Sequence, residues 1–94
     1  MPFEIIVTEK VDKVVAGIRD PAKLKKVEKC FAQLEENPRH PGLSSHPYDD
    51  IVGLLGERIF ESYVENHAPS AWRVWWFYGP GPDEITVVDL GPHP

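Results

Sequence analysis

Hydrophobic and polar positions repeat along the chain with two different periods, and the change of period predicts the elements. Residues 3–8 form a short β-branched run that is typical of a strand. Apolar residues then recur three and four positions apart, which predicts two consecutive helices that end before Asn37-Pro38. The two apolar stripes consist of Val11, Val14, Val15 and Ile18, and of Leu24, Val27, Phe31 and Leu34. Both stripes are expected to face a common partner.

Capping residues indicate where each helix begins. Thr8 can cap the first helix, with Glu9 in its positive first turn. Asp20 can cap the second, and Pro21 suits the first helical position because no amide hydrogen is needed there. The segment is therefore interpreted as a helical hairpin.

Three further strands are predicted, at residues 58–65, 72–78 and 84–90. The connections 67–70 and 79–82 are short and turn-rich, which favours antiparallel neighbours. Residues 48–57 leave two alternatives open, a short strand or a loop packed on the core. The predicted fold class is α+β, with an N-terminal strand, a helical hairpin and an antiparallel β-meander in a single domain, residues 1–94.

Composition narrows the class of protein. The chain is 41% hydrophobic and 27% charged, which is ordinary for a globular domain, and its one cysteine, Cys30, excludes an internal disulfide. No stretch approaches the ~20 apolar residues of a membrane span, and the opening Met-Pro-Phe-Glu lacks the features of a signal peptide. We therefore expect a cytoplasmic protein with no membrane partner.

Charge is unevenly distributed along the chain. The formal net charge is −5, but it is +1 through Pro47 and −6 from Tyr48 onward. Because nucleic-acid binding depends on clustered lysine and arginine, the C-terminal half is a poor phosphate-binding surface on electrostatics alone.

Arg73 is the first candidate for chemistry, because it lies within the most apolar predicted strand. A charged group there must form an ion pair or must line a groove that contains water. Two interpretations remain open: an ion pair with Glu61 or Glu65 on the preceding strand, or a guanidinium that binds a phosphate.

Histidines supply the second set of candidates. His93 follows the last strand, where it can exchange protons near neutral pH or can simply belong to a frayed terminus. The spacings of His40, His46 and His67 match no zinc signature, so surface positions are expected for them and no metal or other cofactor is expected. Cys30 is interpreted as a small core residue.

Several short motifs, taken in order, resemble the RelE/ParE toxin superfamily. In that family a stretch of the form Asn-Pro-Arg-His-Pro-Gly-Leu closes the helical hairpin, and an aromatic-Glu pair opens the next strand. An aromatic-Arg-Val triplet begins the following strand, and the terminal strand runs into a Gly/His segment. The corresponding residues here are Asn37–Leu43, then His46, Phe60-Glu61, Trp72-Arg73-Val74 and Val88–His93.

The resemblance implies the RelE/ParE fold and a toxin of a bacterial type II toxin–antitoxin pair, of the plasmid-stabilisation type. RelE-like members cleave mRNA in the ribosomal A site without metal, using the 2′-hydroxyl as nucleophile, and so inhibit translation. Carried over by position, Arg73 would hold the scissile phosphate and His93 would be the general acid or base. Glu61 or His46 would assist.

The same resemblance implies further contacts and partners. Tyr63 stands where cleaving members usually carry arginine, and it can stack on a base or donate one proton. The residues expected to contact RNA are Tyr63, Arg58, His46 and Trp75. The implied partners are a cognate antitoxin, the ribosome and mRNA, with a homodimer or a toxin–antitoxin hetero-oligomer as the assembly.

Two functions other than mRNA cleavage are also compatible with the sequence. The acidic C-terminal half and Tyr63 favour a non-catalytic binding protein on the same scaffold, directed at gyrase as in ParE or acting through a partner. A plain interaction module that captures another chain at a strand edge or apolar groove is the other alternative.

Overall fold

The computed structural model describes residues 2–65 and 70–93. Their elements confirm the expected α+β class. The N-terminal strand β1 (Glu4–Val7) is followed by helices α1 (Glu9–Ala16) and α2 (Pro21–Glu36) and by a short 3₁₀ helix, η1 (Pro41–Leu43). Four strands complete the described chain: β2 (His46–Val52), β3 (Arg58–Tyr63), β4 (Trp72–Tyr78) and β5 (Glu84–Pro92).

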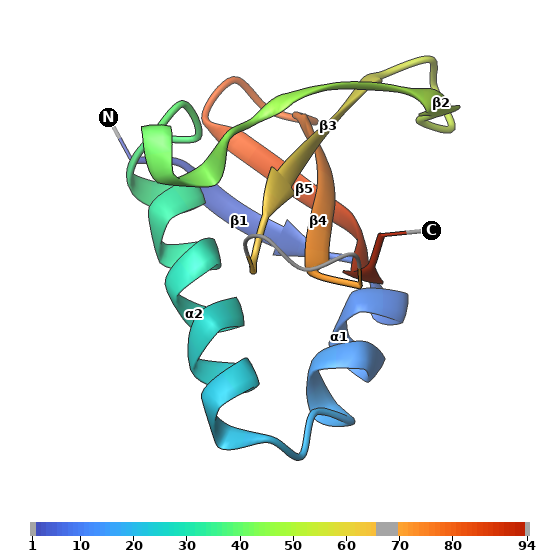
Figure 1. The fold of residues 1–94 in the computed structure, drawn as a ribbon. Helices are drawn as coiled ribbons and strands as arrows, with labels where there is room; N and C mark the ends of the chain where they lie inside the picture. Colours follow the sequence, from blue (N-terminus) through green and yellow to red (C-terminus); the bar gives the residue numbers. More distant parts are fainter. Residues whose placement is uncertain (1, 66–69, 94) are drawn as a thin grey trace.

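The five strands form one sheet in the order β1-β5-β4-β3-β2 (Figure 1). Strands β2 to β5 form an antiparallel meander, as expected. β1 pairs in parallel with β5, with Glu4 opposite Glu84, so the sheet as a whole is mixed. This arrangement places β2 at one edge and β5, which carries the C-terminal residues, beside β4.

Both helices cover the same face of the sheet (Figure 1). They begin at the predicted caps: Thr8 Oγ1 accepts from the Val11 amide at 3.4 Å, and Asp20 Oδ1 accepts from the Ala22 amide at 2.9 Å. The buried cluster between helices and sheet consists of Val11, Val27, Cys30, Leu34, Leu43, Val74, Trp76, Ile85, Val87 and Leu90. The helical hairpin with inward apolar stripes is therefore confirmed, and the opposite face of the sheet is left for other contacts.

The segment that the sequence left open is a strand followed by an exposed turn. β2 extends to Val52, and Leu54 and Leu55 are fully or almost fully exposed. The alternative of a loop packed on the core is therefore wrong for these two leucines. Pro47 and the adjacent Asp49 and Asp50 are poor residues for a central strand, but an edge strand tolerates them.

Two other differences concern the ends of elements. β3 ends at Tyr63, two residues before the predicted end of that strand. β5 continues two residues beyond the expected Leu90, and the His93 amide donates to the Ala71 carbonyl at 3.2 Å, so the chain up to His93 follows the sheet. Most of the predicted turn 67–70, including His67, lies outside the described residues. Within those residues no helix is long and apolar enough to span a bilayer.

Candidate functional site

The face of the sheet away from the helices carries a row of four residues, one on each strand of the meander. His46, Glu61, Trp75 and Asp89 lie opposite one another across β2, β3, β4 and β5. A second row consists of Tyr63, Arg73 and Gly91. Since residues directly opposite in antiparallel strands project from the same face, the registers bring most of the predicted site residues together.

Glu61 is the centre of this group. Its side chain is only 4% exposed, and three basic side chains surround its carboxylate. Oε1 lies 3.0 Å from His46 Nε2 and 3.9 Å from Arg73 Nε, and Oε2 lies 3.5 Å from His93 Nε2. We refer to Glu61, His46, Arg73 and His93 as the Glu61 cluster.

His46 makes two polar contacts through its ring nitrogens. Its Nδ1 lies 2.8 Å from the Ser44 carbonyl oxygen, which can only accept, so Nδ1 carries a hydrogen. Its Nε2 faces Glu61 at 3.0 Å. Both ring nitrogens of His46 therefore contact oxygen atoms of the protein.

Arg73 is largely covered on the same face. Its Cζ lies 3.8 Å from the centre of the Tyr63 ring, and Nη1 donates to the Ala71 carbonyl at 3.4 Å. Nε is buried and makes no hydrogen bond, because its nearest acid, Glu61, is 3.9 Å away. The ion pair expected with Glu61 is therefore present but loose, while Glu65 lies 3.7 Å from both Lys23 and Lys26 instead.

Tyr48 is a member of this site that the sequence did not single out. Its ring centre lies 5.9 Å from that of Trp75 and 6.5 Å from that of His93. Burial raises the pKa of the Tyr48 hydroxyl, and the carboxylates of Asp50 and Glu61 raise that pKa further. His46, Tyr48 and Asp50 are alternate residues of β2, so their side chains would be expected on the same face of the sheet. That expectation requires residues 46–52 to be recognised as a strand.

A cleft of about 290 Å³ adjoins the cluster, and residues from β2, β4 and β5 line it. They are Tyr48, Ile51, Trp75, Asp89, Leu90, Gly91 and Pro92. Gly91 stands opposite Arg73, and a Cβ built on it would meet nothing within 4 Å. The indole nitrogen of Trp75 is buried without a hydrogen-bond partner. This cleft gives the open face room for a ligand beside Arg73 and His93.

Other candidate residues lie elsewhere. Arg58 is exposed and sits over the Phe60 ring at 6.0 Å, on the strand positions that alternate with Glu61. His40 accepts from the Gly42 amide at 3.0 Å, which caps η1. Cys30 is buried in the core as expected, and burial raises the pKa of its thiol to about 12.

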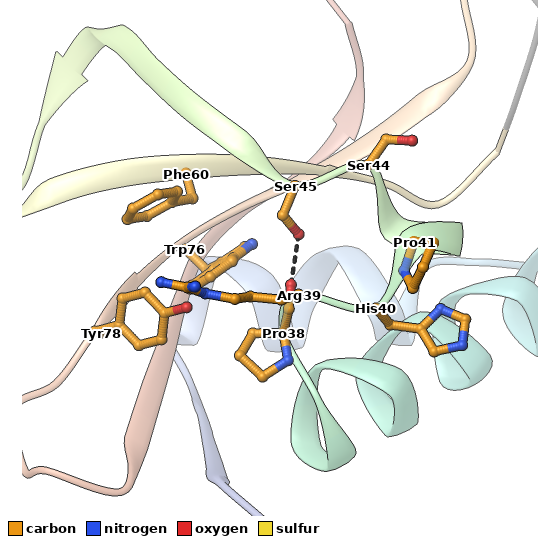
Figure 2. Close-up of a pocket in the computed structure, with 9 residues that line it drawn as sticks. All are labelled: Pro38, Arg39, His40, Pro41, Ser44, Ser45, Phe60, Trp76 and Tyr78. Atoms are coloured by element: carbon orange, nitrogen blue, oxygen red, sulfur yellow. Dashed lines mark hydrogen bonds between the residues drawn. The ribbon is translucent and has the colours of Figure 1, made fainter.

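A second cleft, of about 420 Å³, lies between the loop that follows α2 and strands β3 and β4 (Figure 2). Phe60 and Trp76 stack in it with ring centres 5.0 Å apart, and Arg39 extends across it toward Tyr78. Ser45 joins the loop to the sheet by donating to the Pro38 carbonyl at 2.8 Å. The cleft contains no member of the Glu61 cluster, and it offers ring surfaces and one guanidinium.

Within the described residues, no group of three or more histidine, cysteine, aspartate or glutamate side chains is placed to hold a metal ion. The cluster instead combines a guanidinium, two imidazoles and a buried carboxylate. Such a set can bind an anion and transfer protons.

The chain is similar to known proteins in structure and not in sequence. No protein-family model and no curated protein matches this sequence. A chain of the archaeal RelE–RelB complex from Pyrococcus horikoshii OT3 superposes with a TM-score of 0.71 at 14% identity, covering 98% of this chain and 96% of that one.

Two Helicobacter pylori structures are also similar. A metal-bound toxin has a TM-score of 0.57 at 22% identity, and the conserved hypothetical protein HP0892 has a TM-score of 0.50 at 24% identity. Both matches cover 97% of this chain and 94% of the other. At these identities the likeness concerns the backbone, and it confirms the expected fold: the chain has a RelE-like fold.

Proposed function

We propose that this chain is the toxin of a type II toxin–antitoxin pair and that it cleaves mRNA on the ribosome without a metal ion. The observation that carries the proposal is the Glu61 cluster, since Arg73 and His93 meet at a buried carboxylate on the open face of a RelE-type fold. A cognate antitoxin is the expected partner. A homodimer or a toxin–antitoxin hetero-oligomer stays a prediction.

The proposed reaction is attack of the RNA 2′-hydroxyl on the adjacent phosphorus. The new P–O2′ bond forms as the P–O5′ bond breaks, and the products are a 2′,3′-cyclic phosphate and a 5′-hydroxyl. One group must accept the 2′-hydroxyl proton and another must protonate the leaving O5′. His93 and His46 are 38% and 44% exposed and are the candidates for these two transfers. His46 would first have to release Ser44 or Glu61, because both of its ring nitrogens contact them.

Arg73 and Glu61 have different parts in this scheme. Arg73 would bind the scissile phosphate and stabilise the negative charge that develops on it. Glu61 is too buried to reach RNA, and it contacts both imidazoles. We therefore assign it as a positioning residue that orients His46 and His93.

The acidic charge of the C-terminal half does not fall mainly on this site. Glu65 is balanced by Lys23 and Lys26, and Asp89 lies 3.2 Å from Lys10. Within the cluster one carboxylate faces an arginine and two histidines. Arg73 and the lysine partner of Asp89 therefore offset part of the acidic charge around the site, to which Asp50 beside Tyr48 also contributes.

The test is cleavage of mRNA on programmed ribosomes, read by primer extension. Arg73→Ala and His93→Ala are each expected to slow cleavage by about 100-fold or more, the usual scale for losing an acid–base group or a charge-stabilising group. Arg19→Ala removes an exposed arginine between the helices and is the matched control, expected to cleave like the wild type. Undiminished cleavage by both site variants would refute the assignment.

The cover over Arg73 favours a second candidate, a non-catalytic toxin or binding protein that acts on gyrase or through a partner. The Arg73 side chain is only 13% exposed beneath Tyr63, so a phosphate must displace that ring to reach it fully. For this candidate, purified wild-type protein leaves ribosome-bound mRNA intact. Growth arrest on expression would then be unaffected by His93→Ala, whereas a nuclease would lose toxicity.

A further inference from the structure

The connection between β2 and β3 presents several aliphatic side chains to solvent. Val52, Leu54 and Leu55 are 70%, 103% and 90% exposed, and Ile51 is 40% exposed. These four residues, here named the apolar tip, project beyond the rest of the sheet and away from both helices (Figure 1). Single exposed aliphatic residues are common, but four of them within five consecutive positions indicate an interaction surface.

The backbone of the tip is held in place by hydrogen bonds. The Gly53 amide donates to the Glu57 carbonyl at 3.0 Å, and the Gly56 amide donates to the Gly53 carbonyl at 2.9 Å. The Leu55 amide donates to the Glu57 carboxylate, also at 2.9 Å. Gly56 adopts φ +85°, a conformation that side chains disfavour. The two leucines are thus presented on an ordered turn, which lowers the entropy cost of docking them.

Charges around the tip restrict what can dock there. Asp49 and Asp50 are exposed on β2 directly before it, and Glu57 follows it. Arg58 is the nearest cation in the sequence, and the chain carries −5 overall. An acidic border disfavours nucleic acid and anionic lipid surfaces, which are both negatively charged.

A second copy of the chain is also a poor occupant. In a two-fold contact through this edge the same patch meets itself, so the aspartates of one copy would approach those of the other. Like charges placed opposite each other across paired strands are destabilising. Pro47 moreover lacks an amide hydrogen for pairing along β2.

We propose that the apolar tip, together with Asp49 and Asp50, docks a protein partner that presents aliphatic side chains flanked by lysine or arginine. Aliphatic contacts with Leu54 and Leu55 would supply affinity, and the aspartates would select the basic flank. Ile51 also lines the cleft beside the Glu61 cluster, and Asp50 lies near Tyr48. The proposed surface includes no member of that cluster, so this inference does not depend on RNA cleavage.

The experiment uses the full chain and a short fluorescent peptide of alternating lysine and leucine, with binding followed by anisotropy at several salt concentrations. Leu54→Ser/Leu55→Ser is expected to raise the Kd at least tenfold. Asp49→Asn/Asp50→Asn is expected to raise the Kd and to weaken its salt dependence. Glu35→Gln/Glu36→Gln, an exposed acidic pair at the end of α2, is the matched control and leaves the Kd unchanged.

Several results would overturn the proposal. One is absence of peptide binding, and another is an unchanged Kd in the leucine variant when its thermal unfolding matches the wild type. A wild-type dimer in sedimentation that the leucine variant makes monomeric would assign the tip to a second copy. Binding to phosphatidylcholine vesicles that the same variant loses would assign it to lipid.

Discussion

At the scale of single residues, one chain of hydrogen bonds joins the core to the loop after α2. Trp76 Nε1 lies 2.8 Å from Ser62 Oγ, which lies 2.6 Å from Ser45 Oγ, and Ser45 donates to the Pro38 carbonyl. An indole nitrogen can only donate and a carbonyl can only accept. Each hydroxyl must therefore accept from the tryptophan side and donate toward Pro38, which fixes the direction of every bond.

Ser62→Ala is expected to destabilise the fold by about 1–3 kcal/mol, because it leaves the buried Trp76 N–H without an acceptor. Ser62 and Trp76 are both essentially inaccessible to solvent, so water cannot replace the lost partner without rearrangement. Urea unfolding measures the change. The matched control, Ser70→Ala, alters an exposed serine and should stay within about 0.5 kcal/mol of the wild type.

Some contacts of the candidate site could be predicted from the sequence and others could not. Arg73 was conspicuous because a charge within an apolar strand needs a partner, and Glu61 was one of its two expected partners. His46 was expected at the surface, and the resemblance also implied that it assists at the site. Its side chain is 44% exposed, and the β2–β3 register brings it onto Glu61. Such a cross-strand contact depends on register and cannot be derived from spacing along the chain.

At the scale of elements, the helices were predictable because local signals agreed with the packing. Thr8, Asp20 and Pro21 stand where the helices begin, and the residues of the apolar stripes, except Leu24, belong to the core or pack against it. β2 was harder to predict, since Pro47 and two aspartates lower its strand propensity and the edge position that tolerates them is a tertiary property. The parallel pairing of β1 with β5 is likewise a long-range choice.

The start of α2 provides a test at this scale. Asp20→Ala removes the side-chain acceptor of the Ala22 amide and should lower the free energy of unfolding by about 1 kcal/mol. Asp20→Asn keeps an acceptor oxygen and should fall within a few tenths of a kcal/mol of the wild type. Chemical denaturation of both variants makes the comparison, and equal losses would show that the cap contributes through its charge instead.

At the scale of the whole molecule, the basic groups of the candidate site and the exposed aliphatic residues lie on different surfaces. The Glu61 cluster lies on the open face, where basic groups surround one carboxylate. Asp49 and Asp50 directly precede the projecting turn with its aliphatic residues, and Asp50 also lies near Tyr48 on the open face. Two different surfaces, one suited to an anion and one to a basic apolar partner, thus coexist on a chain with a net charge of −5.

Global stability should depend on pH through Cys30. The folded thiol has a pKa of about 12, whereas an unfolded cysteine ionises near about 8.5, so between these values the unfolded state releases the proton and the folded state keeps it. The stability is therefore full below about pH 8.5 and falls as the pH rises toward 12. From pH 8 to pH 10 the wild type should lose about 2 kcal/mol more than Cys30→Ala, measured by urea unfolding in reducing buffer. Parallel losses in the two proteins would mean that the thiol already ionises in the folded state.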